Sequence, residues 1–169
     1  MDALQALSSR RSIRQFTAEP VSDADLDTVL RAAMAAPSAS NERPWRFLVA
    51  RDQAMREALG NATPYGKPLL GAPVGIVVCA DTGVCKHEGF WVIDCSAAIE
   101  NLLIAAHALG LGAVWLGVHP HPELVGSVSA AAGLPDGIAP HSMIALGHPA
   151  EERPAMDRYD ATFIHSERW

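Results

Sequence analysis

The sequence predicts an α+β fold in a single domain. Helical and extended patterns follow one another along the 169 residues without the strict strand–helix–strand repeat of a parallel α/β sheet. A chain of this length is typical of one domain and is long enough to bury its own core. Its composition, 49% apolar and 19% charged, is that of a globular protein. We therefore expect one domain over residues 1–169.

Four segments have the composition of strands. The clearest is 73–80, a nearly continuous β-branched run of the kind found in strands that are covered on both faces. The others are 45–50, 113–118 and 142–146.

Helical patterns fill most of the intervening chain. Ser22 is a suitable N-cap for a helix with acidic residues in its first turn, an apolar face, and an end before Pro37. Residues 89–109 form a longer helix that is apolar nearly all round, so we expect it to be central or to lie in a subunit interface. Shorter helices are expected at 2–8, 52–59 and 122–132.

Three arginines, Arg10, Arg11 and Arg14, lie close together on a chain with 13 basic and 19 acidic residues. Such a cluster repels itself unless an anion lies against it, and the forked guanidinium favours phosphate. The alternative is a solvated helix end, at which arginines cover the last carbonyl groups. Three local arginines and a net charge of −6 argue against a nucleic-acid binder.

Known phosphate loops are absent. Gly110-Leu111-Gly112 does not complete the dinucleotide-binding pattern, and no Gly-Lys-Ser/Thr run occurs. Any phosphate would therefore be held by side chains. The segment 37–44 carries the hydroxyls of Ser38 and Ser40 and the Asn41 amide, which suit a polyol or a ring edge, although its composition also suits an ordinary turn.

Other chemistries have weaker signals. No Gly-x-Ser-x-Gly motif supports a hydrolase, and Cys79 and Cys95 lie in apolar segments as inert core residues would. His119 and His121 have a workable ligand spacing, but catalytic zinc needs a third protein ligand and the neighbouring prolines favour a turn. We expect no metal site.

The first residues lack the basic start and apolar core of a signal peptide, and the apolar stretch near 99–116 is interrupted by polar residues. We therefore expect a cytoplasmic protein that binds no membrane. The segment 151–169 has no periodicity, yet it carries Tyr159, Phe163 and Trp169. We expect these aromatic side chains to pack on another subunit.

Taken in order, four parts of the chain resemble the nitroreductase family of flavin-dependent NAD(P)H oxidoreductases. They are Arg10–Phe16, Ala36–Phe47, Asp94–Leu103 running into Ala108–Trp115, and Ala145–Pro149. The resemblance covers essentially the whole chain. It implies an α+β fold around a central, mostly antiparallel sheet flanked by helices. It also implies an intertwined homodimer with two FMN sites at its interface and a C-terminal extension, 155–169, that clasps the partner.

The resemblance also implies which residues bind FMN. Arg10, Arg11, Ser12 and Arg14 would hold the phosphate and ribityl chain, with Arg158 as a second phosphate clamp. Pro37, Ser38, Ala39, Ser40 and Asn41 would border the flavin of the other subunit. Lys67 would lie near the pyrimidine side, and Trp115, Leu116, Gly117 and Val118 would run along the flavin edge.

Two positions depart from the family pattern. Met156 stands where a basic residue is common, and Gly117 stands where longer members carry an acidic residue. The chain is short, so the helical insertions that cover the flavin in larger members are reduced. We expect an open substrate pocket.

The activity implied is hydride transfer from NADH or NADPH to flavin N5 and then to a small acceptor such as a nitroaromatic or a quinone, at one site. We assign no catalytic residue, because the cofactor carries the chemistry and the protein orients the rings. Two alternatives stay open. One is other FMN chemistry, such as reductive dehalogenation or ring oxidation. The other is a non-catalytic flavin-binding or redox-sensing module.

Overall fold

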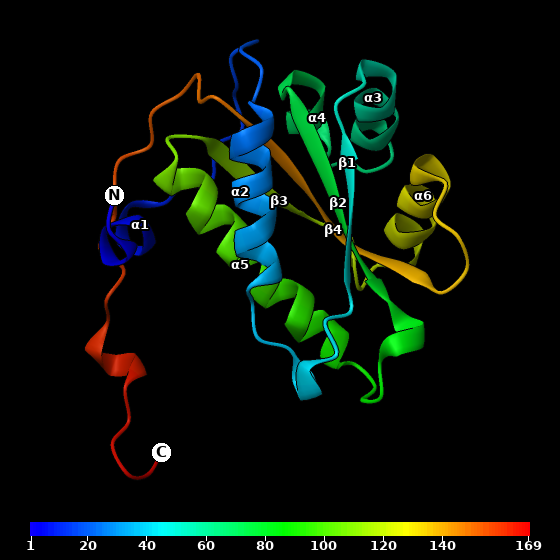
Figure 1. Cartoon of the computed structure of the whole chain (residues 1–169). Helices are drawn as coiled ribbons and strands as arrows, with labels where there is room; N and C mark the ends of the chain where they lie inside the picture. Colours follow the sequence, from blue (N-terminus) through cyan, green and yellow to red (C-terminus); the bar gives the residue numbers. More distant parts are fainter.

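The computed structural model describes residues 1–169, with a four-stranded sheet at the centre of an α+β fold (Figure 1). The strands are β1 (Trp45–Ala50), β2 (Val74–Asp81), β3 (Gly112–Gly117) and β4 (Ile138–Gly147). Their order across the sheet is β1-β2-β4-β3, and every neighbouring pair is antiparallel. The fold class predicted from the sequence is therefore confirmed.

β2 is the strand from which both halves of the core are built. Its side chains alternate between the two faces of the sheet, as the pleat requires. Ile76 and Val78 belong to the larger apolar cluster, whereas Val77 and Cys79 belong to the second one. Because both faces are covered, the strand reads in sequence as one apolar run.

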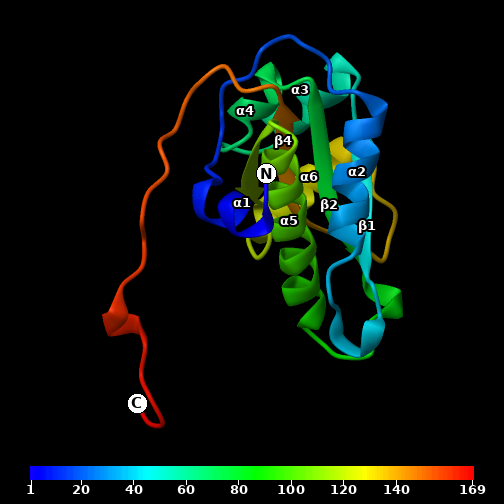
Figure 2. The ribbon, with the colours of Figure 1, turned by 60° about the vertical axis from the view of Figure 1, so that its left-hand side comes forward.

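The chain has six α-helices. They are α1 (Ala3–Ser9), α2 (Asp23–Met34), α3 (Gln53–Asn61), α4 (Lys67–Gly71), α5 (Phe90–Ala108) and α6 (Pro122–Ala132). α2 and α5 pack on one face of the sheet, and α3, α4 and α6 lie on the other (Figures 1 and 2). Residues 89–109 were expected to be central or to lie in a subunit interface, and α5 contributes buried residues to the larger core cluster. By length and composition alone, α5 would pass for a membrane span, but Ile99 and Leu102 are fully buried in the core.

Two elements differ from the sequence prediction. β4 begins at Ile138, four residues before the expected start, because its pairing with β2 continues through a register shift opposite Pro140. The shift accommodates a residue that has no N–H group to donate. α4 was not predicted, because its five residues are too few for helical periodicity to be visible.

α4 is held close to α3 by two glycines. A Cβ atom at Gly66 would overlap the carbonyl oxygen of Gly60, so the two backbones touch where only glycine fits. This contact sets the position of Lys67, the first residue of α4.

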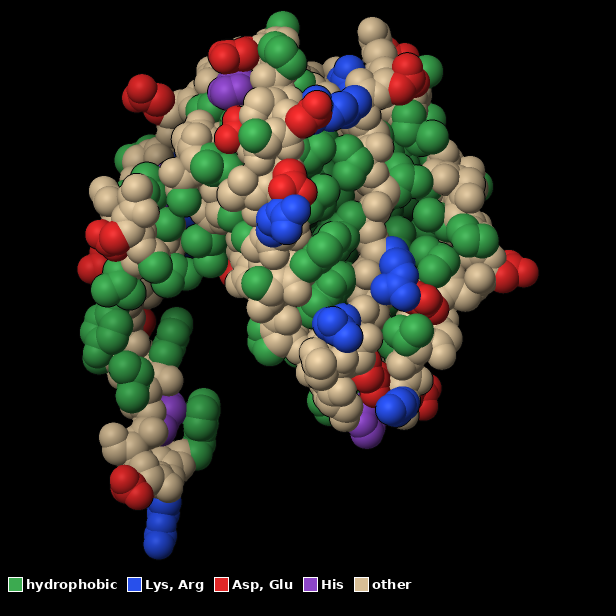
Figure 3. All heavy atoms as spheres, in the orientation of Figure 1, with side chains coloured by type: hydrophobic (Ala, Val, Ile, Leu, Met, Phe, Trp, Pro, Cys, Tyr) green, Lys and Arg blue, Asp and Glu red, His purple; other side chains and the backbone are tan.

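The C-terminal segment extends away from the rest of the chain (Figures 1 and 2). Beyond Glu151 it forms only one 3-10 turn, Ala161–Phe163, and its aromatic side chains are exposed, with Trp169 fully so. The apolar side chains along the extended segment are visible in Figure 3. Arg11 holds the start of this segment, because its Nε donates to the carbonyl of Pro154 (3.0 Å) and its Nη2 to that of Met156 (2.9 Å).

Replacing Gly66 with alanine tests the contact between α3 and α4. We expect Gly66→Ala to lower the free energy of unfolding by about 1–3 kcal/mol, because the methyl group must displace backbone rather than a flexible side chain. Gly71→Ala is the matched control, since nothing lies within 4 Å of the added Cβ, and its stability should stay the same or rise by up to about 1 kcal/mol. Urea unfolding measures both. Equal effects would show that the two helices tolerate separation.

Candidate functional site

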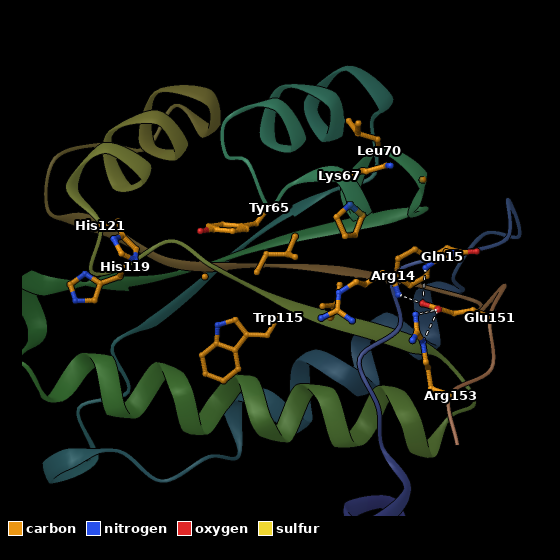
Figure 4. A pocket seen from close by; sticks show the side chains of 16 residues that line it. Arg14, Gln15, Tyr65, Lys67, Leu70, Trp115, His119, His121, Glu151 and Arg153 are labelled. Atoms are coloured by element: carbon orange, nitrogen blue, oxygen red, sulfur yellow. Dashed lines mark hydrogen bonds and ion pairs between the residues drawn. The ribbon is translucent and has the colours of Figure 1, made fainter. Parts of the chain in front are cut away.

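An open cleft of about 1070 Å³ lies between β3, α4 and the two segments that follow α1 and β4 (Figure 4). Its size matches that of cofactor and substrate pockets in general. The residues that line it are Arg14, Gln15, Phe16, Tyr65, Lys67, Pro68, Leu70, Gly71, Val114, Trp115, Leu116, Gly117, His119, His121, Glu151 and Arg153.

One end of the cleft is cationic. The side chains of Arg14 and Lys67 line it, and neither has a hydrogen-bond or ion-pair partner in the chain. Glu151 organises this end: its Oε1 accepts a hydrogen bond from the backbone N–H of Arg14 (2.7 Å), and its Oε2 pairs with Arg153 Nη2 (2.6 Å). These contacts hold the pKa of the Glu151 carboxyl below its usual range, chiefly through the Arg14 N–H. Two unpaired cations facing one cleft favour an anionic ligand.

The floor of the cleft is a strand edge. β3 pairs with β4 on one side only and, apart from a single bridge between Ser12 and Ala113, its other edge is free. A free edge presents backbone N–H and C=O groups that a ligand can pair with. Gly117 adds room, because nothing lies within 4 Å of the place its Cβ would occupy. The half-buried Trp115 adds a flat apolar surface beside this edge.

The other end of the cleft is aromatic and carries imidazoles. Tyr65, His119 and His121 line it, with Trp115 between them and the cationic end (Figure 4). His119 and His121 have a workable ligand spacing, but the sequence predicts no metal site, and the structure has no cluster of three His, Cys, Asp or Glu side chains that includes them. Tyr65 was missed, since a single tyrosine in a loop carries no pattern.

Only some of the predicted FMN-binding residues lie in the cleft. Arg14, Lys67, Trp115, Leu116 and Gly117 all line the cleft. Val118 is fully buried in the core and Ser12 pairs with β3, and neither lines the cleft. Glu151 and Arg153, which also line the cleft, were missed because the segment that carries them has no periodic pattern.

The remaining arginines point elsewhere in the single chain. Arg10 Nε lies 3.4 Å from Glu100 Oε1 on α5, without hydrogen-bond geometry. Arg11 binds the carbonyls of the C-terminal segment instead of the cleft. Arg158, on that segment, shares a separate hollow of about 430 Å³ with Arg10 and Arg11. Adjacent side chains of an extended segment point in different directions. The closeness of the arginines in the sequence therefore does not tell which of them face the cleft.

The loop Pro37–Asn41 does not line the cleft of its own chain. It is a 3-10 turn in which Ser40 and Asn41 have positive φ, and it is tied to the start of α5. The backbone N–H of Ala39 donates to Asp94 Oδ1 (3.0 Å), and Ser40 Oγ is 3.1 Å from His87 Nε2. The loop is thus held in a defined shape outside the cleft of its own chain.

A buried histidine lies behind the aromatic end. Burial lowers the pKa of His141 to about 4, so its imidazole is neutral at pH 7. Its Nε2 is 3.3 Å from Ser96 Oγ and its Nδ1 is 3.1 Å from Ser142 Oγ. Burial also raises the pKa of Cys79 and Cys95 to about 12, so neither thiol is a nucleophile near neutral pH.

Comparison with known proteins identifies the family. The model of the nitroreductase family matches residues 7–64 and 62–148, which together contain the whole sheet and most of the cleft. The chain belongs to the nitroreductase family. The resemblance recognised in the sequence is therefore correct.

Individual relatives match over nearly their whole length. A Methanothermobacter thermautotrophicus protein provisionally named NADH dehydrogenase/NAD(P)H nitroreductase is 46% identical, over 100% of this chain and 88% of its own. A crystal structure from Parabacteroides distasonis with the same provisional name has a TM-score of 0.94 and 36% identity, covering 99% of this chain and 98% of that one. A nitroreductase assigned provisionally, from Desulfovibrio desulfuricans and in complex with FMN, has a TM-score of 0.87 and 37% identity, covering 100% and 98%.

The buried His141 makes the stability of this nitroreductase-family chain dependent on pH. Its pKa is lower in the folded chain, about 4, than the ordinary 6.5, so the unfolded chain binds the additional proton between these values. Stability should fall as the pH drops from about 6.5 toward 4, and His141 should contribute at most about 3 kcal/mol of that loss.

Chemical denaturation at pH 7 and pH 4.5 measures this effect. His141→Gln removes the titrating group, so the difference in unfolding free energy between the two pH values should shrink. His121→Gln is the control, because it removes an exposed histidine. An unchanged pH dependence in His141→Gln would mean that other groups cause the loss.

Proposed function

We propose that this chain is an FMN-dependent oxidoreductase that takes hydride from NADH or NADPH. The observation that carries the proposal is the cleft itself, with two unpaired cations at one end and a free strand edge beside a flat indole along its floor. FMN has a phosphate dianion at one end and a flat ring with hydrogen-bonding atoms along one edge. The donor set of the cleft fits both parts of such a molecule. The FMN complex of the Desulfovibrio relative supports the same ligand.

Each part of the cleft then has a role. Arg14 holds the phosphate, helped by Ser12 and, once the assembly is complete, by Arg10, Arg11 and Arg158. Lys67 lies on the pyrimidine side, where a cation stabilises the negative charge of the reduced ring. The backbone of Trp115, Leu116, Gly117 and Val118 follows the ring edge. When bound, FMN supplies the hydride acceptor and donor chemistry. The protein contributes orientation and charge, and we assign no catalytic residue.

The electron donor and acceptor use the open side of the cleft. The Methanothermobacter relative is named for NAD(P)H, which supports a nicotinamide donor. A small flat acceptor, such as a nitroaromatic or a quinone, replaces the oxidised nicotinamide in a second half-reaction at the same place. NADH and NADPH are intracellular reductants, so we propose that the protein acts in the cytoplasm.

We further propose that the chain works as a homodimer. Its C-terminal segment, 155–169, carries the largely exposed side chains of Tyr159, Phe163 and Trp169. Arg11 fixes the direction in which this segment leaves. Leu4 of α1 and Ile93 of α5 are also exposed. A second subunit would cover these surfaces, and its Pro37, Ser38, Ala39, Ser40 and Asn41 would border the ring.

An absorbance spectrum tests the cofactor and the reaction together. We expect purified protein, or protein mixed with FMN and desalted, to be yellow, and NADH or NADPH to bleach it without oxygen present. Protein that stays colourless in FMN would contradict the cofactor assignment. Yellow protein that neither reductant bleaches would contradict the reductase and favour a flavin-binding module.

Arg14→Ala tests the phosphate contact. We expect FMN affinity to fall by about 1.5–3 kcal/mol, the usual loss when a charge-assisted hydrogen bond is removed. Arg31→Ala is the control, because Arg31 is an exposed residue of α2 paired with Asp27. Fluorescence titration with FMN measures the affinity, and thermal unfolding without FMN should be the same for both variants. An FMN affinity of Arg14→Ala equal to that of the control would show that Arg14 does not bind the phosphate.

Deleting residues 155–169 tests the clasp. The dissociation constant of the dimer, measured by analytical ultracentrifugation, should rise by about tenfold or more, because the segment buries no side chains in its own subunit. A Tyr159→Ala, Phe163→Ala variant keeps the backbone and should have a smaller effect in the same direction. An unchanged constant in both would show that the segment is not part of the interface.

A further inference from the structure

The aromatic end of the cleft has groups that the proposed FMN site does not use. Tyr65, His119 and His121 line it, beyond Trp115 and away from the cations Arg14 and Lys67 (Figure 4). Neither imidazole has a hydrogen-bond partner in the chain, although the buried His141 behind them has Ser96 and Ser142 as partners. Ring nitrogens that line a cleft without partners are available to a ligand.

His119 is held firmly in its place. Its ring meets the edge of Trp91 with centroids 4.7 Å apart, and it stacks over His141 at 6.5 Å with an angle of 18° between the planes. Its backbone N–H donates to the carbonyl of His141 (3.0 Å). His141 is itself neutral, and Ser96 and Ser142 occupy both of its nitrogens. The buried neighbours thus fix the ring of His119 without using its polar atoms.

His121 and Tyr65 complete the group. His121 is the N-cap residue of α6, but its side chain makes no capping hydrogen bond, so the imidazole stays free beside the cleft. Tyr65 is exposed, and Figure 4 shows its hydroxyl directed toward the two imidazoles. All three side chains can donate a hydrogen bond, and Tyr65 with Trp115 also offers flat faces.

No carboxylate lines the aromatic end of the cleft. Glu151 is the only carboxylate among the residues that line the cleft, and it lies at the opposite end, engaged by Arg153 and the backbone of Arg14. The nearest acidic residue in the sequence, Glu123 in the first turn of α6, does not line the cleft. A ligand group that accepts hydrogen bonds meets donors here and no competing acceptor with negative charge.

We propose that His119, His121 and Tyr65 form an acceptor subsite that selects flat aromatic electron acceptors carrying a carboxylate. This inference rests on the proposed function, because it assigns a substrate class to the same cleft. The carboxylate accepts hydrogen bonds from the imidazoles and the phenol, and the ring of the acceptor extends from them over the flavin, from which it takes the hydride. The three residues bind and orient the acceptor and transfer no electron themselves.

Benzoate tests the subsite without turnover, because it has the carboxylate and the ring but cannot be reduced by the enzyme. Calorimetric titration of FMN-saturated protein should give an affinity for benzoate about tenfold higher than for benzyl alcohol, which has the same ring and no charge. His119→Phe with His121→Phe keeps two flat rings and removes their donors. This double variant should bind benzoate about tenfold more weakly and benzyl alcohol unchanged.

Two further variants keep the result interpretable. His121→Phe alone changes an exposed side chain, so it tests the subsite even where the double variant folds poorly, and it should show part of the loss. His148→Phe is the matched control, because His148 lies outside the cleft beside Glu19. In turnover, the double histidine variant should raise KM for 4-nitrobenzoate about tenfold and leave KM for 4-nitrobenzyl alcohol unchanged, whereas His148→Phe should change neither.

The outcomes separate this inference from the function on which it rests. Protein that fails to retain FMN, seen in the spectrum before benzoate is added, overturns both. Protein that is yellow and is bleached by NADPH, but binds benzoate and benzyl alcohol equally well, overturns the subsite alone. A benzoate preference that survives in the double histidine variant also overturns it.

Discussion

The fold depends on the burial of β2 on both faces. Ile76 and Val78 pack toward α2 and α5, while Val77 and Cys79 pack toward the other helices. One strand therefore belongs to two apolar clusters at once, and its antiparallel partners β1 and β4 are fixed on either side of it. β4 in turn positions β3, whose far edge is left free. The cleft exists because the sheet ends there.

Helices and strands with a clear apolar periodicity could be predicted from the sequence. Elements whose position depends on contacts with distant residues could not. Residues 45–50 and 122–132 match the expected strand and helix at both ends, because apolar spacing and flanking prolines mark them. α4 escaped prediction because a glycine contact with α3, rather than its own five residues, holds it in place. The start of β4 escaped because Pro140 is tolerated only through a register shift with β2.

The same distinction holds for the site. Arg14 and Trp115 could be assigned because family motifs carry them, and Lys67 because of its position between those motifs; all three line one cleft. Arg10, Arg11 and Arg14 face α5, the C-terminal segment and the cleft, respectively, and these side-chain directions cannot be predicted from the presence of three arginines within five residues. Glu151 could not be predicted for another reason. Its carboxylate accepts a hydrogen bond from the backbone N–H of Arg14, which is distant in the sequence, and no local pattern indicates such a contact.

The free edge of β3 has a consequence beyond recognition. An unpaired strand edge is a template on which another chain can form a ladder, and proteins commonly cover or charge such edges to avoid aggregation. Here the edge is flanked by Arg14 and Lys67, but the stretch from Trp115 to Gly117 carries no charge of its own. A flat cofactor lying along that stretch would cap it. We therefore expect occupancy of the cleft and colloidal stability to be coupled, with the protein that lacks its ligand as the more aggregation-prone form.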